Sequence, residues 1–469
     1  MRGLALAVGL GALLVAGAVG AALERTAEPT ARSAAPTKAL ERAITAKRLR
    51  AHLSALESIA RRNGGTRAVG TPGYSKSVDY VARQLRKAGY RPRLKTFSFP
   101  YFRETRPTVF ERTLPSTRSY QRGPDFVAMR YSGGGTVNAR VVPVDFSSNT
   151  SGCEGSDFAG FTSGSVALMR RGGCTFTQKA SLAQAHGAAA ALTANDGAPG
   201  RTAPLSATLI GSSSIPVLVV SSEVASQLAA LAQAGPVQVR IVMTVRTTNA
   251  RAASVIADLP GRTKGVVLLG AHLDSVANGP GINDNGSGSA TVLEIARQAR
   301  RLHIRPKHGL RFAFWGAEEL GLVGSRSYVD SLTSSQRRQI LDVINLDMVG
   351  SPNFGRIVYA GDGQPPGSLR IEQAFRAYFA GRRLPVEEES LGGGSDHASF
   401  AAAGIPVGGL FTGADETKSA DSARHFGGQA GRSFDSCYHK SCDTVANIDF
   451  GILEQMADAA AVVAVRLAG

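Results

Sequence analysis

From Ala252 to the C-terminus, apolar strand-like runs alternate strictly with helical segments, and this alternation constrains the fold more than any other feature of the chain. It is typical of a sheet with helices packed on its faces, so it predicts an α/β sandwich with a largely parallel or mixed sheet. The expected strands are residues 253–259, 265–273, 310–316, 342–350, 356–361 and 406–413. The expected helices lie near residues 287–302, 324–330, 368–380, 396–403 and 450–467.

The chain upstream begins with helical spacing. Leu49, Leu53 and Leu56 recur at three- and four-residue intervals, which predicts an amphipathic helix. A second helix of the same kind and a strand at residues 91–99 follow. Residues 23–37 are rich in Ala, Thr, Pro and Arg and show no apolar periodicity, so we interpret them as a linker or pro-segment.

Residues 124–245 differ in character from the sequence on either side. Short β-rich runs and Gly/Ser turns accompany Ala-rich segments, which we expect to be helical near residues 180–191 and 223–234. This composition predicts a small separate domain. The flanking segments 38–123 and 246–469 would then form one discontinuous domain. The β-rich runs are residues 139–146, 165–171, 215–221 and 237–245.

Residues 1–22 have the features of a signal peptide. Arg2 precedes an apolar run from Leu4 to about Val19, and small residues follow that run. An uncleaved membrane anchor is the alternative, because the run approaches the shortest spanning lengths. Its many glycines and alanines favour cleavage, and the first cysteine, Cys153, is too distant for N-terminal lipid attachment. We expect a secreted, soluble protein without a stable membrane anchor.

The chain contains four cysteines, and an even number in an exported protein indicates two disulfides. Three pairings are possible. Cys153–Cys174 and Cys437–Cys442 are the natural choice, because each bond would close one local loop. An alternative is a zinc cluster formed by Cys437, His439 and Cys442.

The charge balance is strongly basic, with 53 Lys and Arg residues against 36 Asp and Glu residues and a formal net charge of +17. The excess is concentrated between Lys38 and Arg122, where 20 basic residues accompany 5 acidic ones. Such a surface can attract nucleic acids, acidic polymers or membranes. No interleaved aromatic and basic motif is present, so we expect a solvated basic face and no specific nucleic-acid partner.

Polar residues follow the predicted strands at their carboxyl ends, where open α/β sheets bind ligands. Each alone would be interpreted as a helix cap, turn or surface residue. Together they favour a cation-binding site, because several buried carboxylates repel one another unless they are protonated or bind a cation. Mixed nitrogen and oxygen donors without thiolate suit zinc, with manganese or cobalt as substitutes. The residues are His272, Asp274, Asp284, Glu318, Glu319, Asp347 and His439.

Six ordered motifs resemble those of the secreted zinc aminopeptidases, in the superfamily that also contains glutamate carboxypeptidase and the transferrin receptor. They span roughly the last two hundred residues, and residues 65–90 resemble the opening helices of the same family. The resemblance implies a three-layer sandwich with a mixed central sheet. The six motifs are GAHLDSV, GINDNGSGSA, FWGAEELGLVGS, NLDMVG, GGSDHASF and CYHKSCDT.

The resemblance also implies two Zn²⁺ ions. His272 and Asp347 would bind one ion, and Glu319 and His439 would bind the other. Asp284 would bridge them, with one carboxylate oxygen on each.

Three further positions take on roles by the same resemblance. Glu318 would be the general base for a metal-activated water and would return the proton to the leaving amine. Tyr438 would stabilise the tetrahedral oxyanion with its hydroxyl group. Asp274 would hydrogen-bond the free nitrogen of His272 and fix its tautomer. The related peptidases show a similar cysteine spacing around their ligand histidine, which favours the Cys437–Cys442 disulfide.

Asp396 and His397 match a family motif and are expected to support the pocket rather than to bind metal. Many relatives carry Arg where this chain has Gly394. The backbone carbonyl of Gly394 is still a candidate to receive the substrate's amino group, but any contact from an Arg side chain is absent. The amine would also face Glu318 and Asp347, and apolar N-terminal residues such as leucine are the expected substrates.

The middle segment resembles a protease-associated domain, on the evidence of residues 168–196 and 215–221. It contains no catalytic constellation of its own, so it would cover the cleft, select substrates or act as a spacer. The whole sequence therefore predicts a monomeric, secreted di-zinc aminopeptidase that acts on peptide N-termini.

Three alternatives remain open at this point. A single-zinc glutaminyl cyclase would form pyroglutamate without releasing an amino acid. A metallocarboxypeptidase needs cationic side chains for the terminal carboxylate, and Gly394 counts against it. A receptor-like binding module is expected to lose metal ligands or the base, whereas all of them are present here.

Overall fold

The computed structural model describes residues 31–198, 201–205, 207–390 and 392–469. The predicted signal peptide, residues 1–22, lies outside these ranges. Within them, no helix combines the length and the apolar character needed to cross a membrane. The first described helix, α1 (Ala31–Ala43), begins inside the predicted linker. Alanine favours helix without apolar periodicity, so the pattern alone did not reveal this helix.

The larger part of the molecule is built on a mixed sheet. Its four central strands, in the order β14, β11, β9 and β10, are parallel, and antiparallel pairings follow on both sides, at β12 and at β8. Strand β13, which the sequence pattern did not reveal, pairs with β12 at the edge. The strands are β8 (Gln238–Leu259), β9 (Val266–His272), β10 (Gly309–Trp315), β11 (Ile340–Leu346), β12 (Ile357–Ala360), β13 (Glu387–Ser390) and β14 (Val407–Phe411).

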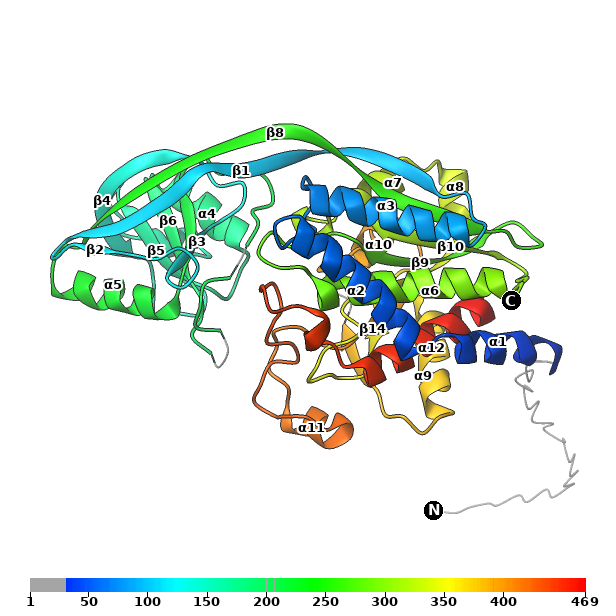
Figure 1. Ribbon diagram of the computed structural model, residues 1–469. Coiled ribbons are helices and arrows are strands. Elements are labelled where there is room, and N and C mark those ends of the chain that lie inside the picture. The colour runs from blue at the N-terminus through cyan, green and yellow to red at the C-terminus, as the bar shows by residue number, and fades with distance from the viewer. Residues whose placement is uncertain (1–30, 199–200, 206, 391) are drawn as a thin grey trace, which may run out of the picture.

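Helices cover both faces of this sheet (Figure 1). Alternate residues of each strand point to opposite faces, so Leu269 of β9 packs among α1, α2, α3, α6, α9 and α12, while Leu268 packs with residues of α7 and α10. The expected three-layer α/β sandwich is therefore confirmed. The helices are α2 (Ala46–Arg62), α3 (Pro72–Lys87), α6 (Gly288–Arg301), α7 (Val323–Asp330), α8 (Ser334–Arg338), α9 (Ser368–Ala380), α10 (His397–Ala401), α11 (Ala420–Phe426) and α12 (Phe450–Leu467).

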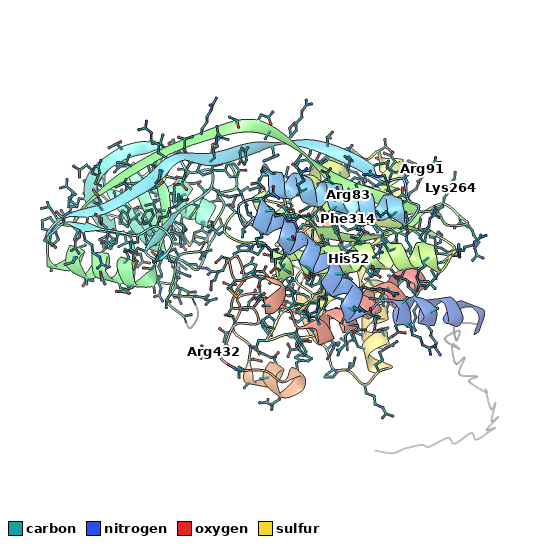
Figure 2. The ribbon with its side chains drawn as sticks, in the orientation of Figure 1. His52, Arg83, Arg91, Lys264, Phe314 and Arg432 are labelled. Carbon is teal, nitrogen blue, oxygen red and sulfur yellow. A yellow bond between two sulfur atoms is a disulfide. The ribbon has the colours of Figure 1, made fainter. Side chains whose placement is uncertain are left out.

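The labelled side chains in Figure 2 illustrate how the residue types are distributed. Phe314 of β10 is fully buried in the core. His52 of α2 is also buried, and its Nε2 atom lies 3.0 Å from Oε2 of Glu294 on α6. This imidazole therefore has a hydrogen-bond partner inside the structure. Arg83 and Arg91, from the basic segment of the sequence, are exposed at the surface.

Two long strands join the sandwich to a second, smaller unit. Strand β1 (Arg93–Leu114) pairs antiparallel with β8 along most of its length, and both arch across the molecule in Figure 1. We expected shorter strands at residues 91–99, 237–245 and 253–259. The intervening residues lack apolar alternation because the middle of the arm is largely solvent-accessible, and the cross-strand hydrogen bonds continue without it. Residue 245, where we expected the smaller domain to end, therefore lies inside a continuous strand.

The smaller unit has a sheet in the order β4, β5, β6, β7 and β3, flanked by α4 and α5. The expected helix at residues 180–191 is wrong at its end: α4 ends at Ala185, and Ala190–Ala194 forms strand β6. Periodicity cannot separate a short buried strand from a buried helix, and β6 is buried between β5 and β7. The elements are β2 (Arg118–Ser119), β3 (Phe126–Ala128), β4 (Gly135–Pro143), β5 (Val166–Arg170), α4 (Phe176–Ala185), β6, β7 (Val217–Val220) and α5 (Ser222–Ala234).

All four cysteines are paired, as Cys153–Cys174 and Cys437–Cys442. These are the two local pairs expected from the sequence, and a zinc cluster built on cysteine thiolates is not formed. We predict that the denatured mature protein will show no mass increase with a thiol-alkylating reagent, and will take up four alkyl groups only after reduction. Alkylation of the unreduced protein would contradict this pairing.

Candidate metal centre

The candidate site lies at the carboxyl ends of three neighbouring parallel strands. His272 is the last residue of β9, and Asp347 directly follows β11. Glu318 and Glu319 form a single 3-10 turn that follows β10. His439 comes from the loop closed by the Cys437–Cys442 disulfide. Parallel neighbours end at the same edge of a sheet, which brings together residues that are far apart in sequence.

Asp284 lies between the two histidines. Its Oδ1 atom is 3.2 Å from His272 Nε2, and its Oδ2 atom is 3.1 Å from His439 Nε2. On the far sides, His272 Nε2 is 3.2 Å from Asp347 Oδ1, and His439 Nε2 is 3.3 Å from Glu319 Oε2. The five predicted metal-binding residues therefore form two groups of three that share one carboxylate.

This donor set fits metal ions. Atoms that bind a tetrahedral zinc ion at about 2 Å are separated from one another by roughly 3.3 Å, close to the distances above. Selected ligand atoms of His272, Asp284 and Glu319 all lie within 4.8 Å of one another. In addition, Glu319 Oε1 and Asp347 Oδ1 are buried, and among the described residues neither oxygen accepts a hydrogen bond of normal geometry, although the His272 imidazole lies 3.2 Å from Asp347 Oδ1. Buried carboxylate oxygens that accept no hydrogen bond are suited to bind a cation.

The electrostatics of the site show the same need for positive charge. Burial alone would lower the pKa of His272, but the carboxylates of Asp347 and Glu318 outweigh burial and raise this pKa well above its usual range. Burial raises the pKa of Glu318 well above its usual value, and Asp347, Asp396 and Glu319 add to the effect. A bound cation would relieve this repulsion between carboxylates.

Asp274 is placed differently from the expectation. Its Oδ1 atom is 3.8 Å from His272 Nδ1, beyond hydrogen-bond distance, and that nitrogen lies 3.2 Å from the backbone carbonyl of Asp274. The carboxylate instead accepts the backbone N–H groups of Glu318 at 3.3 Å and Glu319 at 3.4 Å. Burial raises the pKa of Asp274 to about 7. Asp274 thus orients the turn that carries both glutamates, because the turn's N–H groups have no partner within the helix.

Sequence reasoning missed the residues that orient Asp284. Asp443 is buried, and its carboxylate accepts the backbone N–H groups of Asn283 at 2.7 Å and Asp284 at 3.0 Å. The side-chain amide of Asn283 donates to Asp435 at 2.6 Å. This network joins the loop of Asp284 to the loop of His439. Asp443 directly follows Cys442 inside a motif that the sequence analysis had singled out, and this position was the available clue.

Ser395 was also missed. Its hydroxyl donates to Asp347 Oδ2 at 2.6 Å and accepts from the side-chain amide of Asn345 at 2.9 Å. The neighbouring Asp396 and His397 are buried, and in the described part of the chain neither forms a hydrogen bond or an ion pair with His272 or His439. His397 Nε2 lies 2.7 Å from the backbone carbonyl of Gly392, which supports the loop that contains Gly394.

Arg67 is fully buried beneath the site and was not predicted to contribute. Its guanidinium donates to the backbone carbonyls of Leu273, Pro280 and Gly281, which flank the loop between β9 and Asp284. Burial lowers the pKa of Arg67 to about 10, and nearby carboxylates, Asp274 first among them, oppose that shift. Arg67 therefore fixes this loop and partly balances the negative charge above it.

The site opens into a cleft of about 1310 Å³ that is lined by both parts of the molecule. Tyr438 and Gly394 are among the lining residues, and the ring of Tyr438 stacks on that of His439 at 3.8 Å between centroids. The smaller unit reaches the site directly, because Thr208 Oγ1 donates to the backbone carbonyl of Glu319 at 3.4 Å. Arg171 Nη1 also lies 3.7 Å from Asp415 across the cleft.

Comparison with known proteins identifies the family. Residues 254–464 match the model of Peptidase family M28, and residues 137–228 match that of the PA domain. An aminopeptidase from Pseudomonas aeruginosa is 42% identical over 439 residues, which cover 90% of this chain and 81% of the relative. The chain belongs to peptidase family M28. It is an aminopeptidase that carries a PA domain, as the sequence motifs predicted.

Solved structures agree with this M28 assignment. An aminopeptidase from Aneurinibacillus sp. strain AM-1 superposes with a TM-score of 0.73 at 26% identity, covering 91% of this chain and 95% of that chain. A zinc aminopeptidase from Bacillus subtilis gives a TM-score of 0.68 at 25% identity, covering 90% and 94%. Zinc is accordingly the metal expected for this M28 enzyme.

Proposed function

We propose that this M28 aminopeptidase is a secreted enzyme with two zinc ions that removes single residues from peptide N-termini. His272 and Asp347 would hold one ion, Glu319 and His439 the other, and Asp284 would bridge them. The single observation that carries this proposal is the position of Asp284, whose two oxygens contact two different histidines at 3.2 and 3.1 Å. A carboxylate in that position suits two ions better than one.

Glu318 is the proposed general base. When bound, zinc ions lower the pKa of a water molecule and polarise the scissile carbonyl. Glu318 lies beside the candidate ligands, with Oε2 3.9 Å from His272 Nε2, and its backbone is held by Asp274. The Glu318 carboxylate takes a proton from the attacking water and later donates it to the leaving amine. Burial raises the pKa of Glu318. A raised pKa helps this carboxylate to hold the proton between its removal from water and its donation to the leaving amine.

Substrate contacts follow from the same cleft. The free amine of the peptide would lie near the carboxylates of Glu318 and Asp347 and the carbonyl of Gly394, so that only one residue fits before the scissile bond. The Tyr438 hydroxyl would donate to the oxyanion. Burial and the neighbouring carboxylates, Asp284 first among them, raise the pKa of Tyr438 well above its usual value, which keeps this hydroxyl protonated.

The proposed domain division is a peptidase domain of residues 38–123 and 246–469, with the PA domain, residues 124–245, inserted between them. The PA domain supplies one wall of the cleft through Thr208 and Arg171, which supports a function in substrate access. Two disulfides support export, since such bonds persist in oxidising compartments. We propose that the mature protein is a monomer and has no membrane anchor.

The experiment is an assay of amino-acid release from unblocked and N-acetylated peptides, with and without a chelator. We expect release only from unblocked N-termini, loss of activity with the chelator, and recovery when zinc is added back. Release from the acetylated peptide, or activity that resists prolonged chelation, would contradict the proposal. Formation of pyroglutamate from glutaminyl peptides without amino-acid release would instead favour the cyclase alternative.

A further inference from the structure

A second, smaller pocket borders the active-site cleft at Phe411, and we call it the branch. This smaller pocket has a volume of about 250 Å³, and it shares Glu389, Phe411 and Glu416 with the lining of the main cleft. The two spaces are therefore adjacent. Strand β13, which supplies Glu389, lies at the edge of the sheet, and Glu416 follows β14. The remaining lining residues are Ile357, Glu387, Glu388, Gly413 and Phe434.

The walls leading to this branch are apolar. Met348 and Tyr359 line the main cleft, and Met348 directly follows the candidate zinc ligand Asp347. Tyr359 is 8% exposed, and its hydroxyl forms no hydrogen bond with any residue that the structure describes. Phe411 continues the wall into the branch. A side chain that starts beside Asp347 would thus pass over sulfur and aromatic groups before it reached the carboxylates.

The carboxylates of the branch differ in their partners. Glu388 forms an ion pair with Arg376, and Glu387 accepts a hydrogen bond from Ser422 at 3.2 Å. In the described part of the chain, the Glu416 carboxylate accepts only the backbone N–H of Ala414, at 2.9 Å. The carboxylate of Glu389 has neither a hydrogen bond nor an ion pair within the described ranges. Glu389 and Glu416 are both solvent-exposed residues that line the cleft, and neither has a cationic partner among the described residues.

Two basic side chains close to these carboxylates already have partners of their own. Arg171, which also lines the cleft, lies 3.7 Å from Asp415. The ammonium group of Lys418 donates to backbone carbonyls, including that of Phe354 at 2.7 Å. Burial raises the pKa of Glu389, and the charges of Glu416 and Glu387 raise it further. This mutual repulsion is what a cationic ligand would remove.

We propose that this branch receives the side chain of the substrate's N-terminal residue, and that Glu389 and Glu416 select lysine and arginine there. The inference rests on the proposed function, in which the substrate's amine lies beside Asp347. A lysine or arginine side chain has the required form, because its methylene stem can pack against Tyr359 and Phe411 while its charged end reaches carboxylates. Leucine would fit the walls but would gain no ion pair with either carboxylate.

The test compares two substrates that share an aliphatic stem and differ in charge, the p-nitroanilides of lysine and norleucine. We expect kcat/KM to be about tenfold higher for the lysine substrate in the zinc-loaded wild-type enzyme. In the double variant Glu389→Gln/Glu416→Gln, this ratio should fall to about one. The matched control is Glu223→Gln/Asp330→Asn, which makes the same change in charge at two exposed positions outside the cleft and should keep the wild-type ratio.

The outcomes distinguish a failure of the proposed side-chain selection from a failure of the proposed aminopeptidase function. A wild-type ratio at or below one, or an equal ratio in the wild type and in the Glu389→Gln/Glu416→Gln variant, would overturn the selection of basic residues and leave the aminopeptidase mechanism standing. A fall of the ratio in both double variants would assign the effect to net charge and overturn the proposed site. No turnover of either substrate would contradict the proposed function itself, and this inference with it.

Discussion

Replacing Glu318 by glutamine should lower kcat by about a thousandfold or more, while the protein keeps its full zinc content. Glutamine has nearly the shape of glutamate, and the backbone of residue 318 would still be held by Asp274. It cannot, however, take a proton from water at neutral pH. Since Glu318 is not one of the five proposed ligands, its replacement should remove proton transfer and leave both metal ions in place.

Steady-state kinetics on an unblocked peptide, together with elemental analysis of the same preparation, would check this expectation. The control is Glu223→Gln, the same substitution at an exposed position on α5 outside the cleft. If Glu318→Gln kept wild-type turnover, the general base would have to be another group. If zinc were lost together with activity, Glu318 would belong among the ligands.

The positions of Glu318 and its neighbours could be predicted because they depend on a simple rule. His272 and Asp347 lie at the ends of strands that the sequence pattern predicts well, and parallel strands must end at one edge of the sheet. Once the alternation of strands and helices is recognised, residues 75 positions apart are expected to meet. The motif resemblance then distributes them into two groups, and the observed contacts with Asp284 are compatible with that division.

The supporting residues could not be predicted in the same way. The Asp443 carboxylate orients Asp284 by accepting hydrogen bonds from two backbone N–H groups. One of these bonds joins residues that are 160 positions apart in the sequence. Ser395 reaches Asp347 from a different loop. These contacts depend on how loops fold over the sheet edge, and loops carry no periodicity from which their approach can be inferred. Strand β6 was assigned wrongly for a related reason, because burial on both faces removes the alternation that marks a strand.

The continuous arm of β1 and β8 is the clearest difference at the level of the fold. Residues 246–251 are polar except for Ala250 and are at least partly exposed, so the sequence suggests a break between two domains there. Pairing with β1 nevertheless continues through this region, from Arg103 opposite Arg246 to Ser98 opposite Arg251. Backbone hydrogen bonds can extend a strand beyond its buried part, and the side-chain pattern does not record them.

The second large effect should come from Asp284, whose replacement by alanine is expected to abolish the binding of both zinc ions. Each proposed ion has three protein ligands, and Asp284 is counted in both sets. Its loss would leave each ion with one histidine and one carboxylate, fewer than the three protein ligands typical of catalytic zinc sites. Activity should fall by about a thousandfold or more, because the metal supplies most of the activation of water.

Thermal unfolding separates this effect from general damage to the fold. Zinc that binds only the folded state stabilises it, so added zinc should raise the Tm of the chelator-treated wild type. The Tm of Asp284→Ala should not respond to zinc. Asp421→Ala is the control, since Asp421 is an exposed residue of α11 whose carboxylate pairs, among the residues that the structure describes, only with Arg424 at the surface. A variant Asp284→Ala that retained two zinc ions per chain would contradict the bridging assignment. Retention of one ion would show instead that the two groups of ligands bind independently, with Asp284 belonging to only one of them.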